Sequence, residues 1–138
     1  MVSVRSCALG HKQQVITTHG AVDAIDHVLG AYLTRSDAVA FEDPCFLAGI
    51  GVIRVNGYRI APVDIAESLA AALRHGARAA VVTSRALNPT GASVSAERAS
   101  ELRAVLAEHS HVLVIEDDHF SGVANTNTAP DVSRNPPR

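Results

Sequence analysis

Apolar and polar positions along the chain follow two periodicities in turn. Short runs of small and β-branched residues predict strands, and apolar residues spaced three or four apart predict helices. Strands are expected at residues 15–18, 38–41, 58–63, 78–84 and 112–115. Helices are expected between them, from Gly20 to Tyr32, over 46–55, over 65–73 and from Ser95 to Leu106. The chain therefore alternates strand and helix from residue 15 to residue 115.

This alternation favours an α/β fold, specifically a three-layer α/β/α arrangement around a mostly parallel sheet. The runs AVVT and VLVI lack an apolar–polar alternation, which is typical of strands covered on both faces. We expect one domain over residues 14–120, preceded by a lead of residues 1–13. Residues 121–138 are polar and rich in proline and asparagine, so we expect a loop or a disordered tail there.

Composition restricts the kinds of partner. Hydrophobic residues make up 47% of the 138 positions, charged residues 19%, and the formal net charge is −2. The sequence has no basic block that would predict direct nucleic-acid contact, and it has no apolar run as long as a membrane span. The start has no apolar core of a signal peptide, and two cysteines, Cys7 and Cys45, make no disulfide framework. A cytoplasmic protein is expected.

Polar residues directly follow four of the expected strands. Ligands of open parallel sheets bind beyond the carboxyl ends of the strands, so these residues should gather at one edge. The segments are 19–21 (HGA), 42–44 (EDP), 85–91 (RALNPTG) and 116–119 (EDDH). A functional site is therefore expected at the carboxyl edge of the sheet.

Each segment also has a simpler interpretation. Gly20 suits a tight turn, and a helix that starts there could bind an anion. Residues 88–91 suit an ordinary turn, and Cys45 resembles a small buried hydrophobe more than a nucleophile. The acidic cluster at 116–118 could be a solvated strand end or a magnesium site. The histidine spacing does not indicate zinc, and no metal ligand is assigned.

The segments together are more specific than any one of them. Gly20-Ala21 at a helix start, then EDPCF, NPTG and IEDDH, resemble the large domain of fold-type-I aminotransferases of class I and II, which use pyridoxal 5′-phosphate. The order is most similar to the aminotransferase-like domain of the MocR subgroup of GntR-family transcriptional regulators. The resemblance covers residues 14–120 and implies a partial large domain of that fold.

The resemblance implies a role for seven residues. Backbone N–H groups of Gly20, Ala21 and Val22 would bind the cofactor phosphate, and Phe46 would stack on the pyridine ring. Asp117 would pair with the pyridine nitrogen and keep it protonated, which makes the ring an electron sink. The 3′-oxygen would be contacted by Asn88 and by His119, which stands where relatives commonly have tyrosine.

A lysine that forms the internal Schiff base is expected after the acidic motif in this family. The only lysine of this sequence is Lys12, which precedes the first expected strand and matches no catalytic position. We therefore assign no catalytic residue, expect a truncated relative that does not transaminate alone, and expect pyridoxal phosphate binding to be weak or lost. The resemblance also implies a small amino compound as a second ligand, and a homodimer.

Three functions stay open from the sequence. The chain could be a pyridoxal-phosphate-binding, aminotransferase-like domain that is catalytically incomplete. It could be the effector-sensing piece of a MocR-type regulator, which acts by binding rather than by turnover. In a third hypothesis the acidic cluster is a metal or phospho-acceptor site of a receiver-like domain. Receivers place their acid pair after the first strand, whereas this pair follows the last one, and this disfavours the third hypothesis.

Overall fold

The computed structural model describes residues 2–5, 15–64 and 66–120, with the side chains of residues 3–5 left aside. The elements in chain order are β1 (Val2–Arg5), α1 (Ala21–Tyr32), β2 (Ala38–Glu42), α2 (Leu47–Val55), β3 (Arg59–Val63), α3 (Ala66–Arg74), β4 (Ala77–Thr83), α4 (Ala96–Ala107) and β5 (Leu113–Asp117).

The strands form one sheet in the order β1-β5-β4-β2-β3. Strands β3, β2, β4 and β5 run parallel, and β1 pairs antiparallel with β5. The sheet is therefore mostly parallel, as predicted. Pro62 lies in β3, an edge strand, where its missing N–H group costs no ladder hydrogen bond.

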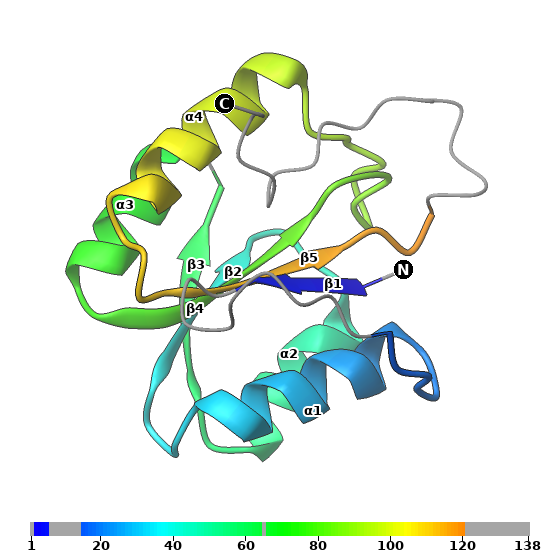
Figure 1. The fold of residues 1–138 in the computed structure, drawn as a ribbon. Helices are drawn as coiled ribbons and strands as arrows, with labels where there is room; N and C mark the ends of the chain where they lie inside the picture. Colours follow the sequence, from blue (N-terminus) through cyan, green and yellow to red (C-terminus); the bar gives the residue numbers. More distant parts are fainter. Residues whose placement is uncertain (1, 6–14, 65, 121–138) are drawn as a thin grey trace.

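Helices cover both faces of the sheet. Figure 1 shows α1 and α2 against one face and α3 and α4 against the other. Successive strand residues point to opposite faces, so Val39 and Val81 belong to the α1/α2 core while Ala40 and Val82 belong to the α3/α4 core. All four are buried. The three-layer α/β/α prediction is confirmed, and burial on both faces explains the uninterrupted apolar runs.

The strand predicted at residues 15–18 is wrong. These residues have no regular structure, and the side chains of Val15 and Ile16 are 96% and 69% exposed. A β-branched run forms a strand only where a neighbouring strand offers backbone partners. The free edge of β5 is paired with β1, which lies in the segment predicted to be only a lead.

The remaining predicted elements form, with ends displaced by one or two residues. Ser95 is the N-cap of α4, where its Oγ accepts a hydrogen bond from Arg98 N at 3.1 Å. Asp23 lies in the first turn of α1, where its negative charge complements the helix dipole. Ile65, most of the lead with Lys12, and the predicted tail lie outside the described residues.

Within the described ranges, no helix has the length and apolar character needed to cross a membrane.

Candidate functional site

The carboxyl ends of β4 and β5 lie side by side. Thr83 is in register with Asp117, and Ser84 N donates to Asp117 O at 3.1 Å just beyond the two strands. Strand β2 is the other neighbour of β4 and also ends here, at Glu42. The polar segments that follow these strands therefore start from one edge, as the sequence predicted.

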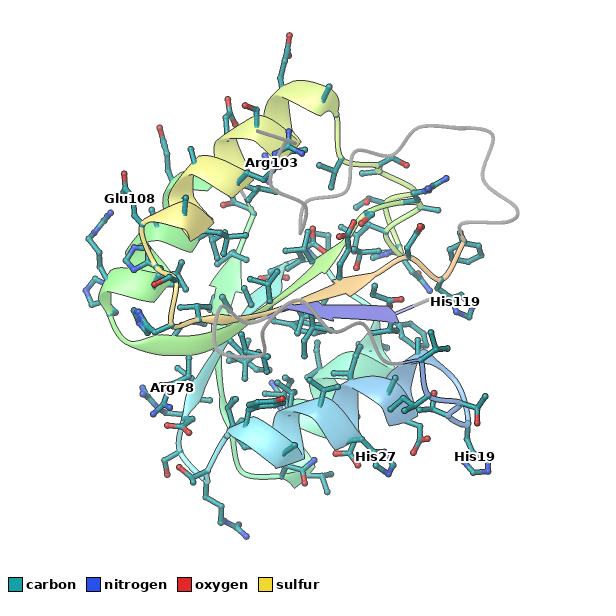
Figure 2. The ribbon with its side chains drawn as sticks, in the orientation of Figure 1. His19, His27, Arg78, Arg103, Glu108 and His119 are labelled. Carbon is teal, nitrogen blue, oxygen red and sulfur yellow. The ribbon has the colours of Figure 1, made fainter. Side chains whose placement is uncertain are left out.

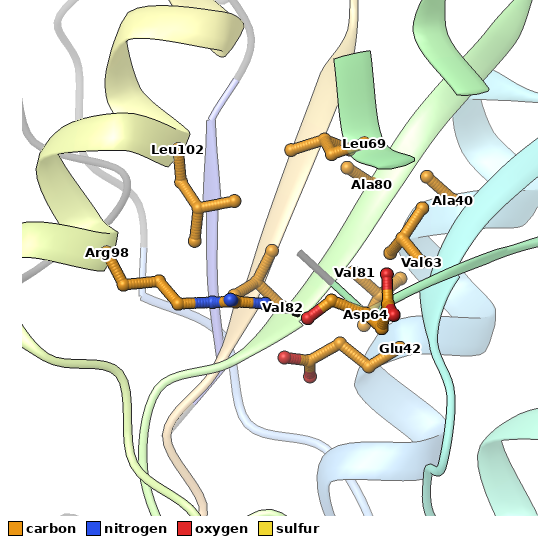
Figure 3. A pocket seen from close by; sticks show the side chains of 10 residues that line it. All are labelled: Ala40, Glu42, Val63, Asp64, Leu69, Ala80, Val81, Val82, Arg98 and Leu102. Atoms are coloured by element: carbon orange, nitrogen blue, oxygen red, sulfur yellow. Dashed lines mark hydrogen bonds between the residues drawn. The ribbon is translucent and has the colours of Figure 1, made fainter. Parts of the chain in front are cut away.

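Glu42 ties the end of β2 to the end of β4. Its Oε2 accepts a hydrogen bond from Thr83 N at 2.7 Å. Burial raises the pKa of Glu42, although the Thr83 hydrogen bonds and the Arg98 charge oppose the shift. Figure 3 shows Glu42 and Arg98 lining a small cavity under α3 and α4, of about 20 Å³. That is room for about one water molecule, so this cavity is too small for an organic ligand.

A second polar pair lies between β4 and β5. Ser84 Oγ donates a hydrogen bond to Glu116 Oε1, and the two residues are 1% and 6% exposed. Buried polar groups are costly unless they are hydrogen-bonded, so this pair explains how Glu116 is accommodated inside the sheet. Glu116 has a structural partner rather than an opening to a ligand.

Asp117 differs from both of these carboxylates. Its Oδ1 is buried and has no hydrogen-bond partner among the described residues. Burial is the main cause that raises the pKa of Asp117, with a smaller push from the Asp118 charge, while the charge and backbone N–H of His119 oppose it. A buried acceptor without a donor is unusual, and it indicates a place for a donor beyond the residues that the structure describes.

Asp118 forms an ion pair across the edge. Its Oδ1 lies 3.1 Å from Arg85 Nε, and each of the two side chains is 14% exposed. Arg85 belongs to the loop after β4 and Asp118 to the segment after β5. The pair therefore joins the two segments that carry Asn88 and Asp117.

Asn88 lies at the tip of the loop between β4 and α4, and its side chain is exposed. Below the tip, Leu87 N donates to Ala92 O at 2.8 Å and forms an isolated antiparallel bridge. Gly91 N donates back to Leu87 O. The peptide bond between Asn88 and Pro89 is cis. The tip is thus a turn closed on itself, as the Asn-Pro-Thr-Gly sequence predicted.

Helix α1 starts at the same end of the sheet. Gly20 is its N-cap with φ 114°, a conformation that favours glycine, and no side chain caps the helix. His19 N donates to Asp23 Oδ2 at 2.9 Å, so the Asp23 carboxylate does not occupy the first helical N–H groups. Figure 2 shows His19 and His119 toward the same end of the molecule. The first N–H groups of any α-helix lack intrahelical partners, and here they belong to residues predicted to bind a phosphate.

The start of α2 places an aromatic ring at this edge. Phe46 is the N-cap residue of α2 and is 50% exposed. Its neighbour Cys45 is a free thiol that packs against the α1/α2 core. Burial, and then the charges of Asp43 and Glu42, raise the pKa of Cys45. A raised pKa disfavours the thiolate, in keeping with the interpretation of Cys45 as a packing residue.

The sequence prediction missed three contacts at the edge of the sheet. They are Glu42 with Thr83 N, Ser84 with Glu116, and Arg85 with Asp118. A signal was present, because polar residues at the ends of neighbouring parallel strands are candidates for pairing. Register decides which of them meet, and the register is not written in the sequence pattern.

Comparison with known proteins identifies the family. The family model of aminotransferases of class I and II matches residues 5–137. The chain belongs to this family. The vitamin B6 salvage pathway transcriptional repressor PtsJ of Salmonella typhimurium is 42% identical over 127 residues, which are 88% of this chain and 30% of PtsJ. The family resemblance inferred from the motifs is confirmed, and the match to a repressor agrees with the regulator subgroup.

Solved aminotransferases share the fold. LysN, the α-aminoadipate aminotransferase of Thermus thermophilus, superposes with a TM-score of 0.65 at 25% identity, over 72% of this chain and 27% of LysN. The N-succinyldiaminopimelate aminotransferase of Mycobacterium tuberculosis superposes with a TM-score of 0.62 at 22% identity, over 82% of this chain and 28% of that enzyme. The chain spans less than a third of each relative.

Membership of the aminotransferase family overturns the receiver-like hypothesis. The described ranges also hold no group of three or more histidine, cysteine or acidic side chains arranged to hold a metal ion. The acids that follow β5 have other surroundings, because Glu116 bonds to Ser84 and Asp118 pairs with Arg85. Asp117 Oδ1 has neither a hydrogen-bond partner nor an ion-pair partner among the described residues.

The edge of the sheet fits pyridoxal 5′-phosphate, the cofactor that the family implies. A protonated pyridine nitrogen is a cationic donor, and the buried Oδ1 of Asp117 is an acceptor that lacks one. The start of α1 offers N–H groups for a phosphate, and Phe46 offers an exposed aromatic face. The structure thus brings Asp117 and His119 next to each other and joins the Asn88 loop to them. The roles of Gly20, Ala21, Val22, Phe46, Asn88, Asp117 and His119 stay predictions.

Proposed function

We propose that this chain is a pyridoxal-phosphate-binding portion of an aminotransferase-like protein, and that it acts by binding rather than by turnover. The observation that carries the proposal is the buried Asp117 Oδ1 without a hydrogen-bond partner among the described residues. When bound, the cofactor supplies an electron-poor ring that stabilises negative charge at carbon.

Asp117 would hold the ring nitrogen in its protonated form. Burial raises the pKa of Asp117 and disfavours its charged form, and the charge and backbone N–H of His119 oppose this only in part. A pyridinium N–H beside Oδ1 would lower that pKa again, because an opposite charge at hydrogen-bond distance favours the carboxylate. Desolvation strengthens this attraction relative to water. The ligand would thereby offset a further part of the cost of burying Asp117, beyond what His119 contributes.

The other predicted contacts would orient the ligand. The N–H groups of Gly20, Ala21 and Val22 would bind the phosphate at the positive end of α1. Phe46 would cover one face of the ring, and Asn88 and His119 would donate to its 3′-oxygen. Both Asn88 and His119 are exposed, so they are accessible to a ligand from solvent.

Turnover needs a lysine amine, and within this sequence no lysine follows Asp117. We therefore propose that this stretch of chain holds the cofactor without a covalent bond and does not transaminate by itself. A second copy in a homodimer, and an amino compound as a further ligand, are predictions that the family resemblance supports.

Sensing of a vitamin B6 compound is a second candidate function. The 42% identity to PtsJ, a transcriptional repressor of a vitamin B6 salvage pathway, favours it. In that case ligand occupancy at Asp117 would be the signal, and the site chemistry would be the same. The two candidates differ in whether a bound amino compound is ever converted, so transaminase assays on a full-length relative would separate them.

Binding is tested with a ligand that has no aldehyde. 4′-Deoxypyridoxine 5′-phosphate keeps the pyridine ring, the 3-hydroxyl and the phosphate of the cofactor. It cannot form an imine with Lys12 or with the N-terminal amino group. We expect saturable binding in equilibrium dialysis of the 138-residue chain. Asp117→Ala and Asn88→Ala should each weaken it by about tenfold or more, the loss of one good charged or polar contact.

Glu97→Gln is the matched control, because Glu97 is an exposed acid in the first turn of α4. It should leave the affinity unchanged. Inorganic phosphate should compete weakly, through the α1 start alone. If Asp117→Ala and Asn88→Ala bind like the parent chain, or if the parent does not bind, the proposed function is wrong.

A further inference from the structure

The loop between β4 and α4 has its own internal hydrogen bonds. Val94 N donates to Ser84 O at 3.0 Å at its base, and Leu87 pairs with Ala92 further out. Between these levels Ala86 N donates to Ser93 Oγ at 3.2 Å. These bonds hold the loop together, but they join the loop to itself and not to the segment after β5.

Among the described residues, two contacts that connect the base of this loop to the end of β5 and the residue after it carry the argument. One is the backbone hydrogen bond from Ser84 N to Asp117 O, at 3.1 Å. The other is the ion pair between Arg85 and Asp118, with 3.1 Å between Nε and Oδ1. A single contact leaves a rigid loop free to pivot, whereas a second contact from the next residue fixes its direction.

The backbone next to Arg85 is suited to such a pivot. Ala86 has φ 48°, in the left-handed region that residues with a side chain seldom adopt. A conformation of this kind persists only where surrounding contacts enforce it. The Arg85 side chain is the charged anchor directly before this position, and Asn88 lies two residues after it.

The burial of the Arg85–Asp118 ion pair also supports a role in fixing the loop. Each side chain of the pair is only 14% exposed, so the pair is screened less than a surface ion pair. Asp118 is the immediate neighbour of Asp117, and its negative charge acts on Asp117.

We propose that the Arg85–Asp118 ion pair is a positioning pair, which fixes the Asn88 turn relative to the Asp117 carboxylate so that both can contact one ring. This proposal rests on the proposed function for the identity of the ring, but not for the positioning itself. Neither residue of the pair would touch the ligand. Their effect would come through the separation and orientation of the two residues that do.

The first arm of the test needs no ligand. Amide hydrogen exchange is measured for Leu87 and Gly91 in the loop, with the buried Leu29 of α1 as an internal reference. We expect Arg85→Met to speed exchange at the loop amides by about tenfold and to leave Leu29 unchanged, because only a local attachment is lost. Arg85→Lys keeps a positive charge in reach of Asp118 and should restore most of the protection.

The second arm measures affinity for 4′-deoxypyridoxine 5′-phosphate. Arg85→Met should weaken binding by about tenfold or more, since small misplacements of contacting groups are costly. Arg85→Lys should recover most of the affinity, and Asp118→Asn should weaken it in the same direction. Arg74→Met, an exposed arginine in the last turn of α3, is the matched control and should change neither arm.

The outcomes separate the inference from the proposed function. If the parent chain does not bind the ligand, the proposed function fails, and the exchange arm still decides the positioning role. Unchanged loop exchange in both Arg85→Met and Asp118→Asn would overturn the positioning pair. Equal loss in Arg85→Lys and Arg85→Met would also overturn it, because the charge would then have no part. Asp118→Asn, which keeps the size of the side chain, gives a decision even where Arg85→Met does not fold.

Discussion

Two carboxylates stand at the carboxyl ends of β2 and β5, the two parallel strands that flank β4, and they are in opposite situations. Glu42 ends β2, and its Oε2 accepts the Thr83 N–H group at 2.7 Å, with Arg98 across a water-sized cavity. Asp117 ends β5, and its Oδ1 is buried without a partner among the described residues. Burial raises the pKa of both. The same carboxylate chemistry thus completes a contact within the fold at the end of β2 and leaves an oxygen without a partner among the described residues at the end of β5.

The difference teaches how a site can be told from a structural contact. Burial and a raised pKa do not distinguish the two acids, because both have them. Hydrogen-bond completeness does distinguish them, since an acceptor left without a donor is a cost that folding alone does not explain. An unfinished contact of this kind favours function at Asp117 over function at Glu42.

The largest expected effect comes from replacing each acid by leucine. Glu42→Leu removes the acceptor of Thr83 N and should lower the free energy of unfolding by about 2 kcal/mol, the usual cost of a stranded buried donor. Asp117→Leu leaves no comparable buried donor without an acceptor, because the His119 N–H group that donates to Asp117 belongs to an exposed residue. This variant should change the free energy of unfolding little. Urea unfolding measures both, and equal losses would remove the distinction between the two acids.

A smaller, pH-dependent effect should accompany Asp117→Asn. In the parent chain, the pKa of Asp117 in the folded state is raised above the ordinary value of 3.8. The folded protein therefore binds the Asp117 proton more tightly than the unfolded chain does. The stability from this group is complete below pH 3.8 and is lost as pH rises through the raised pKa. The stability of Asp117→Asn relative to the parent should therefore increase across that window and then level off.

Glu42→Gln provides the comparison, measured by thermal unfolding at a series of pH values. The pKa of Glu42 is also raised, so its variant should show the same sign of pH dependence, from the ordinary value of 4.5 upward. The amide oxygen of glutamine can still accept the Thr83 N–H group. A decrease of relative stability with rising pH in either variant would contradict the burial of that carboxyl.

The smallest effect is expected at Arg98. Its guanidinium donates to Asp64 O, and its charge lowers the pKa of Glu42 against the stronger effect of burial. Arg98→Met should cost about 1 kcal/mol of unfolding free energy in urea, because the hydrogen bond to Asp64 O is exposed to solvent and water replaces part of it. Ligand affinity should not change, since Arg98 lies beside Glu42 at the end of β2 and not beside Asp117. A loss of affinity as large as that in Asp117→Ala would mean that the two strand ends act as one site.

Much of the fold follows from local patterns. The runs at β2, β4 and β5 are apolar and β-branched, and the spacing of Ile25 and Leu29 in α1 places both on the buried face. Ser95 and Gly20 mark helix starts by their chemistry. The family resemblance adds the order of the motifs and the expected edge of the sheet. Long-range pairing does not follow, which is why residues 15–18 were expected as a strand while Val2–Arg5 forms one.

The sequence by itself determined the residue types at the site, the strand and helix periods, and the family, because these depend on near neighbours and on motif order. Only the tertiary structure decided which polar groups meet. Glu116 and Asp118 had no assignable role in the sequence, and they lie against Ser84 and Arg85. Asp117 stands between them in the chain but keeps Oδ1 without a partner among the described residues. Alternation along β5 points Glu116 and Asp117 to opposite faces of the sheet, and Asp118, which follows the strand, lies against Arg85, so three consecutive acids have three different environments.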